Sequence, residues 1–131
     1  MAKEKKIPKN IQNILQKLKK NDRELGEFCL KNTVDALKAN GYTDAHIWAP
    51  TILPNVLGEL EYVESDIDLE EWILELEGME RDVVESIYDT FVYMKESLKG
   101  AKEKDIKEAL VYSLSRTLES MDKEKYKRLY G

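Results

Sequence analysis

Glycine and proline are scarce in this chain, which has six glycines and three prolines among 131 residues. A sheet of many strands needs frequent turns, and these two residues supply many of the turn conformations. The shortage therefore favours long helices joined by short connections. We predict an all-α fold, an irregular bundle of five to seven helices formed by a single domain that spans residues 1–131.

Apolar residues recur at helical spacing along most of the sequence. The strongest series lies within residues 79–98, where Val84, Ile87 and Phe91 fall on one side of a helix. A wide apolar stripe of this kind indicates a helix that is central in the bundle or that also faces a partner. The other predicted helices cover residues 8–20, 23–38, 54–65, 66–78, 102–120 and, as a short tail, 122–130.

Residues 46–54, HIWAPTILP, hold the only histidine, one of two tryptophans and two of the three prolines. Pro50 disfavours a helical conformation at the residue before it, and Pro54 can occupy the first turn of a helix. We therefore expect an irregular, proline-containing corner over residues 42–56. Its apolar side chains favour packing against the bundle. In the alternative, Trp48 stands exposed as an aromatic anchor for a partner.

Charge is segregated along the chain, although the total is only −5. Residues 1–40 contain ten Lys or Arg and five Asp or Glu, and residues 93–131 contain ten and seven. Residues 41–92, in contrast, contain one Arg and fourteen Asp or Glu. Such asymmetry within a small chain is a signal of a charged partner.

The acidic residues of the middle segment repeat at helical spacing. Asp82, Glu85 and Asp89 share one face of the strongest helix, and Glu71 and Glu75 share a face of the helix before it. If the two helices pack side by side, their outer faces form a negative surface that attracts a basic partner. Two alternatives stay open, namely that these acids neutralise the basic helices or that they only keep the surface solvated.

The N-terminal lysines offer a second functional hypothesis, contact with nucleic-acid phosphates. A lysine arm binds phosphates as point charges without reading the sequence, and we expect residues 1–7 to form a flexible basic arm. The negative charge of the whole chain opposes this function. The lysines concerned are Lys3, Lys5, Lys6, Lys9, Lys17, Lys19 and Lys20.

A third hypothesis is a homo-oligomeric structural component. Val83, Val92 and Tyr93 widen the apolar stripe of the strongest helix beyond what a narrow helix seam requires. A second copy of the chain could cover that additional surface.

Cysteine, histidine and carboxylate chemistry is poorly supported by the sequence. Cys29 is the only cysteine, so no internal disulfide can form, and it falls on an apolar stripe, which favours an inert buried thiol over a nucleophile paired with His46. One histidine and one cysteine cannot form a zinc cluster. Asp66 and Asp68 fit the first positions of a calcium loop, but Glu71 stands where that loop requires glycine.

The sequence also lacks the phosphate-binding motif G-x-x-x-x-G-K-[ST], the dinucleotide-binding motif G-x-G-x-x-G and the nucleophile motif G-x-S-x-G. We therefore expect no enzymatic activity, no cofactor and no metal. No apolar run approaches the length of a membrane span, and the basic start has no apolar segment behind it, so we expect a cytoplasmic protein.

In charge and fold class the chain is similar to small bacterial or phage inhibitors and immunity proteins, an analogy that involves no shared motif. The leading hypothesis is a non-enzymatic module for protein–protein interaction. It would dock an acidic helical face on a basic surface of a partner protein, which could itself handle nucleic acid. The residues predicted to bind the partner are Glu71, Glu75, Asp82, Glu85, Asp89 and Trp48.

Overall fold

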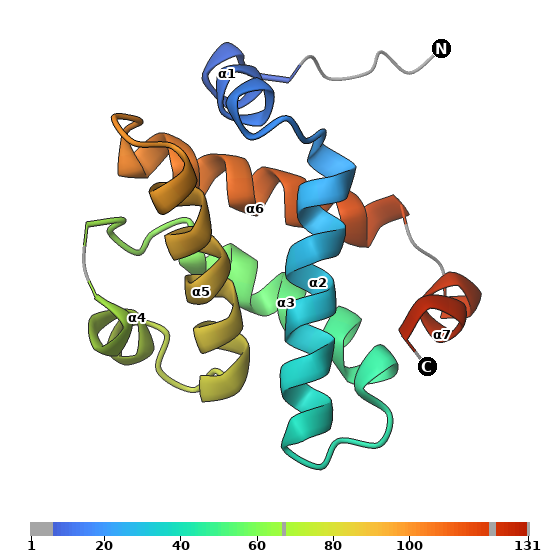
Figure 1. The fold of residues 1–131 in the computed structure, drawn as a ribbon. Coiled ribbons are helices and arrows are strands. Elements are labelled where there is room, and N and C mark those ends of the chain that lie inside the picture. Colours follow the sequence, from blue (N-terminus) through green and yellow to red (C-terminus); the bar gives the residue numbers. More distant parts are fainter. Residues whose placement is uncertain (1–6, 67, 121–122, 131) are drawn as a thin grey trace.

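The structure, a computed structural model, describes residues 7–66, 68–120 and 123–130, which contain seven helices and no strand (Figure 1). This confirms the all-α prediction. The helices are α1 (Lys9–Leu18), α2 (Asp22–Ala39), α3 (Ala45–Leu60), α4 (Leu69–Glu75), α5 (Arg81–Ser97), α6 (Glu103–Ser120) and α7 (Lys123–Tyr130).

Helix α2 is the centre of the bundle and packs against α3, α5 and α6 (Figure 1). It runs antiparallel to α5, since Phe28 lies against Tyr93 and the Ser86 hydroxyl reaches the backbone oxygen of Asn32. Helix α4 flanks α5 on the side opposite α2, and α6 crosses α2. Helix α5, which carries the strongest apolar series, therefore lies between α4 and α2.

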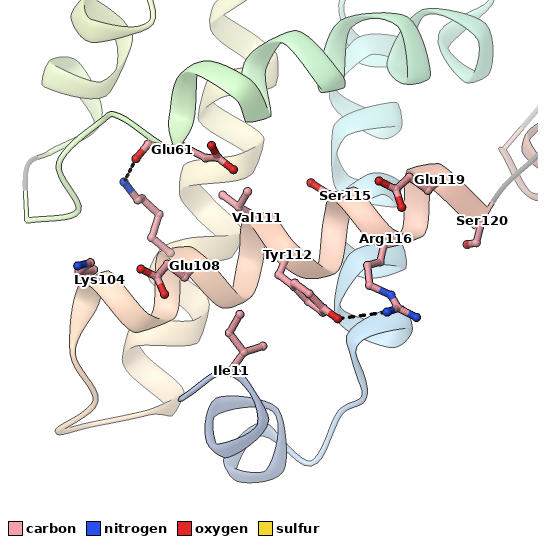
Figure 2. A pocket seen from close by; sticks show the side chains of 11 residues that line it. Ile11, Glu61, Lys104, Glu108, Val111, Tyr112, Ser115, Arg116, Glu119 and Ser120 are labelled. Atoms are coloured by element: carbon pink, nitrogen blue, oxygen red, sulfur yellow. Dashed lines mark hydrogen bonds between the residues drawn. The ribbon is translucent and has the colours of Figure 1, made fainter. Parts of the chain in front are cut away.

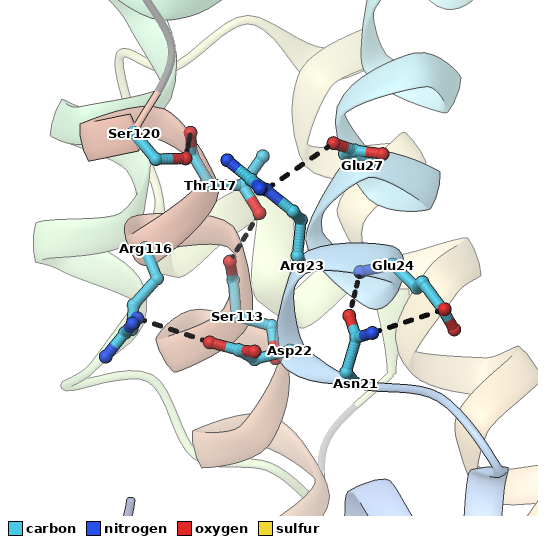
Figure 3. A network of polar contacts seen from close by, with 9 residues as sticks. All are labelled: Asn21, Asp22, Arg23, Glu24, Glu27, Ser113, Arg116, Thr117 and Ser120. Carbon is cyan, nitrogen blue, oxygen red and sulfur yellow. Dashed lines mark hydrogen bonds and ion pairs between the residues drawn. The ribbon is translucent and has the colours of Figure 1, made fainter. Parts of the chain in front are cut away.

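Side-chain caps fix the start of two helices. The Asn21 side chain accepts a hydrogen bond of 2.8 Å from the backbone N–H of Glu24 at the start of α2 (Figure 3). Asp68 does the same at α4, accepting a bond of 2.9 Å from the N–H of Glu71. Each bond satisfies a backbone donor that the helix itself leaves unpaired, which stabilises a helix by about 1 kcal/mol. Asp68 is therefore the cap of α4.

The crossing of α2 and α6 brings polar side chains of the two helices together (Figure 3). Arg116 of α6 pairs with Asp22 in the first turn of α2, at an Nε–Oδ2 distance of 3.2 Å. Thr117 of α6 is buried and donates its hydroxyl to the backbone oxygen of Ser113, one turn earlier. The helices meet at Gly26, which is also buried.

The predicted irregular corner over residues 42–56 is wrong, because α3 begins at Ala45 and continues through Pro50 and Pro54. A proline inside a helix removes one hydrogen bond and costs about 3 kcal/mol. Burial of one face of α3 offsets that cost, and both prolines lie outside the buried series. The buried residues recur at helical spacing: Ala45, Ala49, Leu53, Val56, Leu57 and Leu60.

Trp72 anchors α4 to the core. Its ring is fully buried, 5.0 Å from the Tyr88 ring and 5.3 Å from the Phe91 ring of α5, measured between centroids. The Trp72 indole N–H donates to the backbone oxygen of Glu64, so the polar end of the side chain is satisfied. The short helix α4 is therefore held against α5 by a single large aromatic side chain and its neighbours.

Candidate interaction surface

The three acidic residues predicted on α5 share its outer side. Asp82 and Glu85 are half-buried and Asp89 is exposed, whereas Val83 and Ile87 between them are buried. The alternation follows from the helical period, which turns residues at steps of three and four to the same side. These carboxylates therefore face away from the core, as the sequence indicates.

Helix α4 places the other two predicted acids, Glu71 and Glu75, in solvent beside α5. An ion pair links the two helices, since Arg81 Nη2 lies 2.9 Å from Glu70 Oε1. Both partners of that pair are more than half exposed, so it contributes little to stability. The structure thus brings the five predicted carboxylates onto the solvent sides of two adjacent helices.

Basic side chains neutralise little of the negative charge of residues 59–89. Residues 59–89 contain thirteen Asp or Glu and one Arg. Among the described side chains, Arg81 with Glu70 is the only ion pair that involves these acids. Four other ion pairs join described side chains, and all of them lie outside residues 59–89: Arg23–Glu27, Lys31–Asp35, Lys95–Glu103 and Arg116–Asp22. The basic helices therefore pair mainly with their own acids.

Trp48 stands at the surface and not in a packed corner. Its side chain is 48% exposed and that of the preceding Ile47 is 56% exposed. The Tyr42 ring meets Trp48 edge-on, with 6.1 Å between the centroids. Packing in the core is therefore the wrong expectation for Trp48, because the helical period of α3 turns Ala45 and Ala49 inward and these two residues outward.

The Tyr42 hydroxyl connects this aromatic pair to the acidic segment. The negative charge of Glu80 is the main cause that raises the pKa of Tyr42, followed by burial, a hydrogen bond to Glu80 and the charge of Asp82. Glu80 is exposed and immediately precedes α5. The start of α3 and the acidic start of α5 are therefore neighbours on the surface.

Leu74 is a surface residue that the sequence reasoning missed. Its side chain is 74% exposed on α4, with Glu71 and Glu75 beside it. A signal was present, because Leu69, Trp72, Ile73 and Leu76 form the inward stripe and Leu74 is the apolar residue outside it. Single exposed apolar residues are common, however, so Leu74 alone does not define a site.

The lysines of the nucleic-acid hypothesis are only partly described. Lys9, Lys17 and Lys19 are exposed on or next to α1, and Lys20 is half-buried. Ile7, the last residue of the expected basic arm, packs against the core. Lys3, Lys5 and Lys6 lie outside the described residues.

The stripe of the oligomer hypothesis is largely occupied within the chain. Val83 is fully buried and Val92 is half-buried. Tyr93 packs on Phe28 of α2, with 5.4 Å between ring centroids, and stays partly exposed. The width of the stripe therefore reflects contacts with α2 as well as with the core.

A pocket of about 820 Å³ opens between α6, α1 and the end of α3 (Figure 2). Its charged lining has both signs, with Lys104 and Arg116 against Glu108 and Glu119. Tyr112 and Arg116 within it are joined by a hydrogen bond of 3.1 Å. Because positive and negative side chains both line the pocket, it has no dominant charge.

Lys107 at the edge of this pocket has a structural role. Its Nζ donates to the backbone oxygens of Glu61 and Val63, just beyond the last turn of α3. Burial lowers its pKa, whereas the negative charges of Glu108 and Glu61 act in the opposite direction and the positive charge of nearby Lys104 lowers it further. A cation here satisfies carbonyls at the negative end of a helix.

Cys29 is buried, as the sequence predicts. Burial raises its pKa from 9.0 to about 12, although hydrogen bonds with Thr90 and Thr33 act in the opposite direction. A thiol in this environment is a poor nucleophile, because the thiolate is the reactive form. His46 is half-buried on α3 and is not among these partners.

Among the residues that the structure describes, no group of three or more His, Cys, Asp or Glu side chains is arranged to hold a metal ion. Within the same residues, no helix combines the length and the apolar character needed to cross a membrane. Comparison of the chain with protein-family models, curated proteins and solved structures finds no match in any of the three.

Proposed function

We propose that this chain is a non-enzymatic protein–protein interaction module, an inhibitor or regulator of the bacterial or phage type that acts in the cytoplasm. It docks the outer faces of α4 and α5 on a basic surface of a partner protein. The observation that carries the proposal is the weakly neutralised charge of residues 59–89, where a single ion pair among the described side chains involves any of the thirteen acidic residues.

The physical role of this surface is electrostatic attraction. A patch of one sign steers an oppositely charged partner and can raise the association rate by one to three orders of magnitude, an effect that salt screens. Glu71 and Glu75 on α4 and Asp89 on α5 are exposed, so their charge is available to such a partner. A protein that handles nucleic acid would present a suitable basic surface.

Co-purification with matched charge variants tests the proposal. Glu85→Lys with Asp89→Lys reverses two charges on α5. Glu119→Lys with Glu124→Lys makes the same change in net charge on exposed residues of α6 and α7. Each variant is tagged and isolated from the native cell, and the bound proteins are identified by mass. We expect a basic partner to be lost from the α5 variant alone, whereas equal recovery with both variants would contradict the proposal.

A further inference from the structure

The exposed side of α3 from its start to Gly58 is unusual for this chain because it carries no formal charge. Residues 45–58 contain no Asp, Glu, Lys or Arg, although 36% of the whole chain is charged. We call the exposed residues of this segment the α3 outer face: Ile47, Trp48, Thr51, Pro54, Asn55 and Gly58. Helix α7 packs against α3 and still leaves Ile47 and Trp48 about half exposed.

Carboxylates border the aromatic end of this face. Asp44 is exposed one residue before α3, and Tyr42, whose ring contacts Trp48, lies close enough to Glu80 for its negative charge to raise the pKa of Tyr42. An apolar centre with a charged rim is the usual anatomy of a protein interface, and tryptophan is among the residues that contribute most to binding. The border of this face therefore selects the charge of whatever covers it.

A second copy of the chain is a poor occupant for electrostatic reasons. Each copy carries a net charge of −5, and a two-fold interface centred on Trp48 would bring the acidic rim of Asp44 and Glu80 close to its own symmetry mate. Like charges in that arrangement oppose association. A partner with positive charge around an apolar patch has the complementary pattern.

We propose that the α3 outer face is the central anchor of the docking surface and that Trp48 receives an arginine-bearing apolar patch of the partner protein. The inference rests on the proposed function and specifies its partner. Arginine fits better than lysine because its planar guanidinium stacks on aromatic rings and also pairs with carboxylates. Here the ring is Trp48, and the carboxylates are Asp44, four residues before it, and Glu80, whose charge acts on the adjoining Tyr42. The acids of α4 and α5 then steer the partner toward this centre, which adjoins the start of α5 through Tyr42.

Photo-crosslinking in the native cell locates the contact while the partner is still unidentified. We would replace Ile47 with p-benzoylphenylalanine and, in separate chains, replace Leu74 on α4 and the exposed Asn13 on α1. The expected result is an adduct at position 47 with a partner peptide that contains arginine. An adduct with a second copy of this chain would overturn the inference. So would an adduct at position 74 when position 47 gives none. No adduct at any position would count against the proposed function as well.

Binding kinetics with the crosslinked partner, purified, provide the quantitative test. Trp48→Ala should raise the dissociation rate by about thirtyfold, the effect of losing a hot-spot side chain, and Leu74→Ala should change it by less than about threefold. Conversion of the crosslinked arginine to lysine should weaken binding by about tenfold or more. If Trp48→Ala has no effect while Glu85→Lys with Asp89→Lys does, the anchor is wrong and the proposed function stands. If neither affects binding, both fail.

Discussion

Gly26 of α2 lies so close to Thr117 of α6 that a β-carbon on Gly26 would stand 1.9 Å from Thr117 Oγ1. The same β-carbon would stand 2.4 Å from the backbone oxygen of Ser113, which cannot move away as a side chain can. The two helices therefore cross at a glycine because any larger residue would force their backbones apart.

Gly26→Ala should lower the free energy of unfolding by about 1–3 kcal/mol or more, since the added methyl overpacks the crossing. Gly58→Ala is the matched control, because Gly58 also lies inside a helix but has open space around its β-position. It should raise stability by about 0.5–1 kcal/mol. Urea unfolding followed by circular dichroism measures both. Equal shifts of the same sign would show that α2 and α6 do not approach so closely.

Lys107→Met should destabilise the fold, because the buried backbone oxygen of Val63 and the partly buried one of Glu61 lose their donor. A buried acceptor left without a partner costs about 1–3 kcal/mol. Lys104→Met, an exposed change on the same helix, should stay within about 0.5 kcal/mol of the parent. Thermal and urea unfolding check the difference. Similar stability of the two variants would contradict the capping role of Lys107.

Stability should fall at alkaline pH in a manner that depends on Cys29. The thiol ionises near pH 9.0 in the unfolded chain, whereas burial raises its pKa in the folded chain to about 12. The contribution of the neutral Cys29 thiol to the free energy of unfolding is therefore fully present below pH 9.0. Above pH 9.0 this contribution is lost by about 1.4 kcal/mol per pH unit. Between pH 8 and about pH 10.5 the parent should lose about 2 kcal/mol more than Cys29→Ala. Urea unfolding at each pH measures the two stabilities. If the parent and Cys29→Ala lose the same free energy of unfolding, Cys29 is accessible to solvent.

The two tryptophans should differ in acrylamide quenching, because Trp48 is half exposed and Trp72 is fully buried. The native emission should contain a quenchable and a resistant component. Trp48→Phe should remove the quenchable one and leave a protected, blue-shifted signal. Strong quenching that persists in this variant would show that Trp72 is accessible and that α4 does not pack as described.

Much of the bundle follows from local sequence signals, as the cap at Asn21 and the inward stripe containing Trp72 illustrate. The path of α3 does not follow from local signals, because Pro50 and Pro54 oppose a helix locally. What supports the helix is the packing of its buried face against residues far away in the sequence. The carboxylates of α5 could be placed from helical period alone. The exposure of Trp48 could not, since it depends on the continuity of α3 through its prolines.

The association rate with the purified partner, measured over a range of ionic strength, tests the acidic docking surface most directly. We expect a fast rate at low salt that falls steeply as salt is added. Glu85→Lys with Asp89→Lys should slow association and flatten the salt dependence, whereas Glu119→Lys with Glu124→Lys should affect both less. An association rate that is independent of salt and equal in all three proteins would contradict an acidic docking surface on α4 and α5.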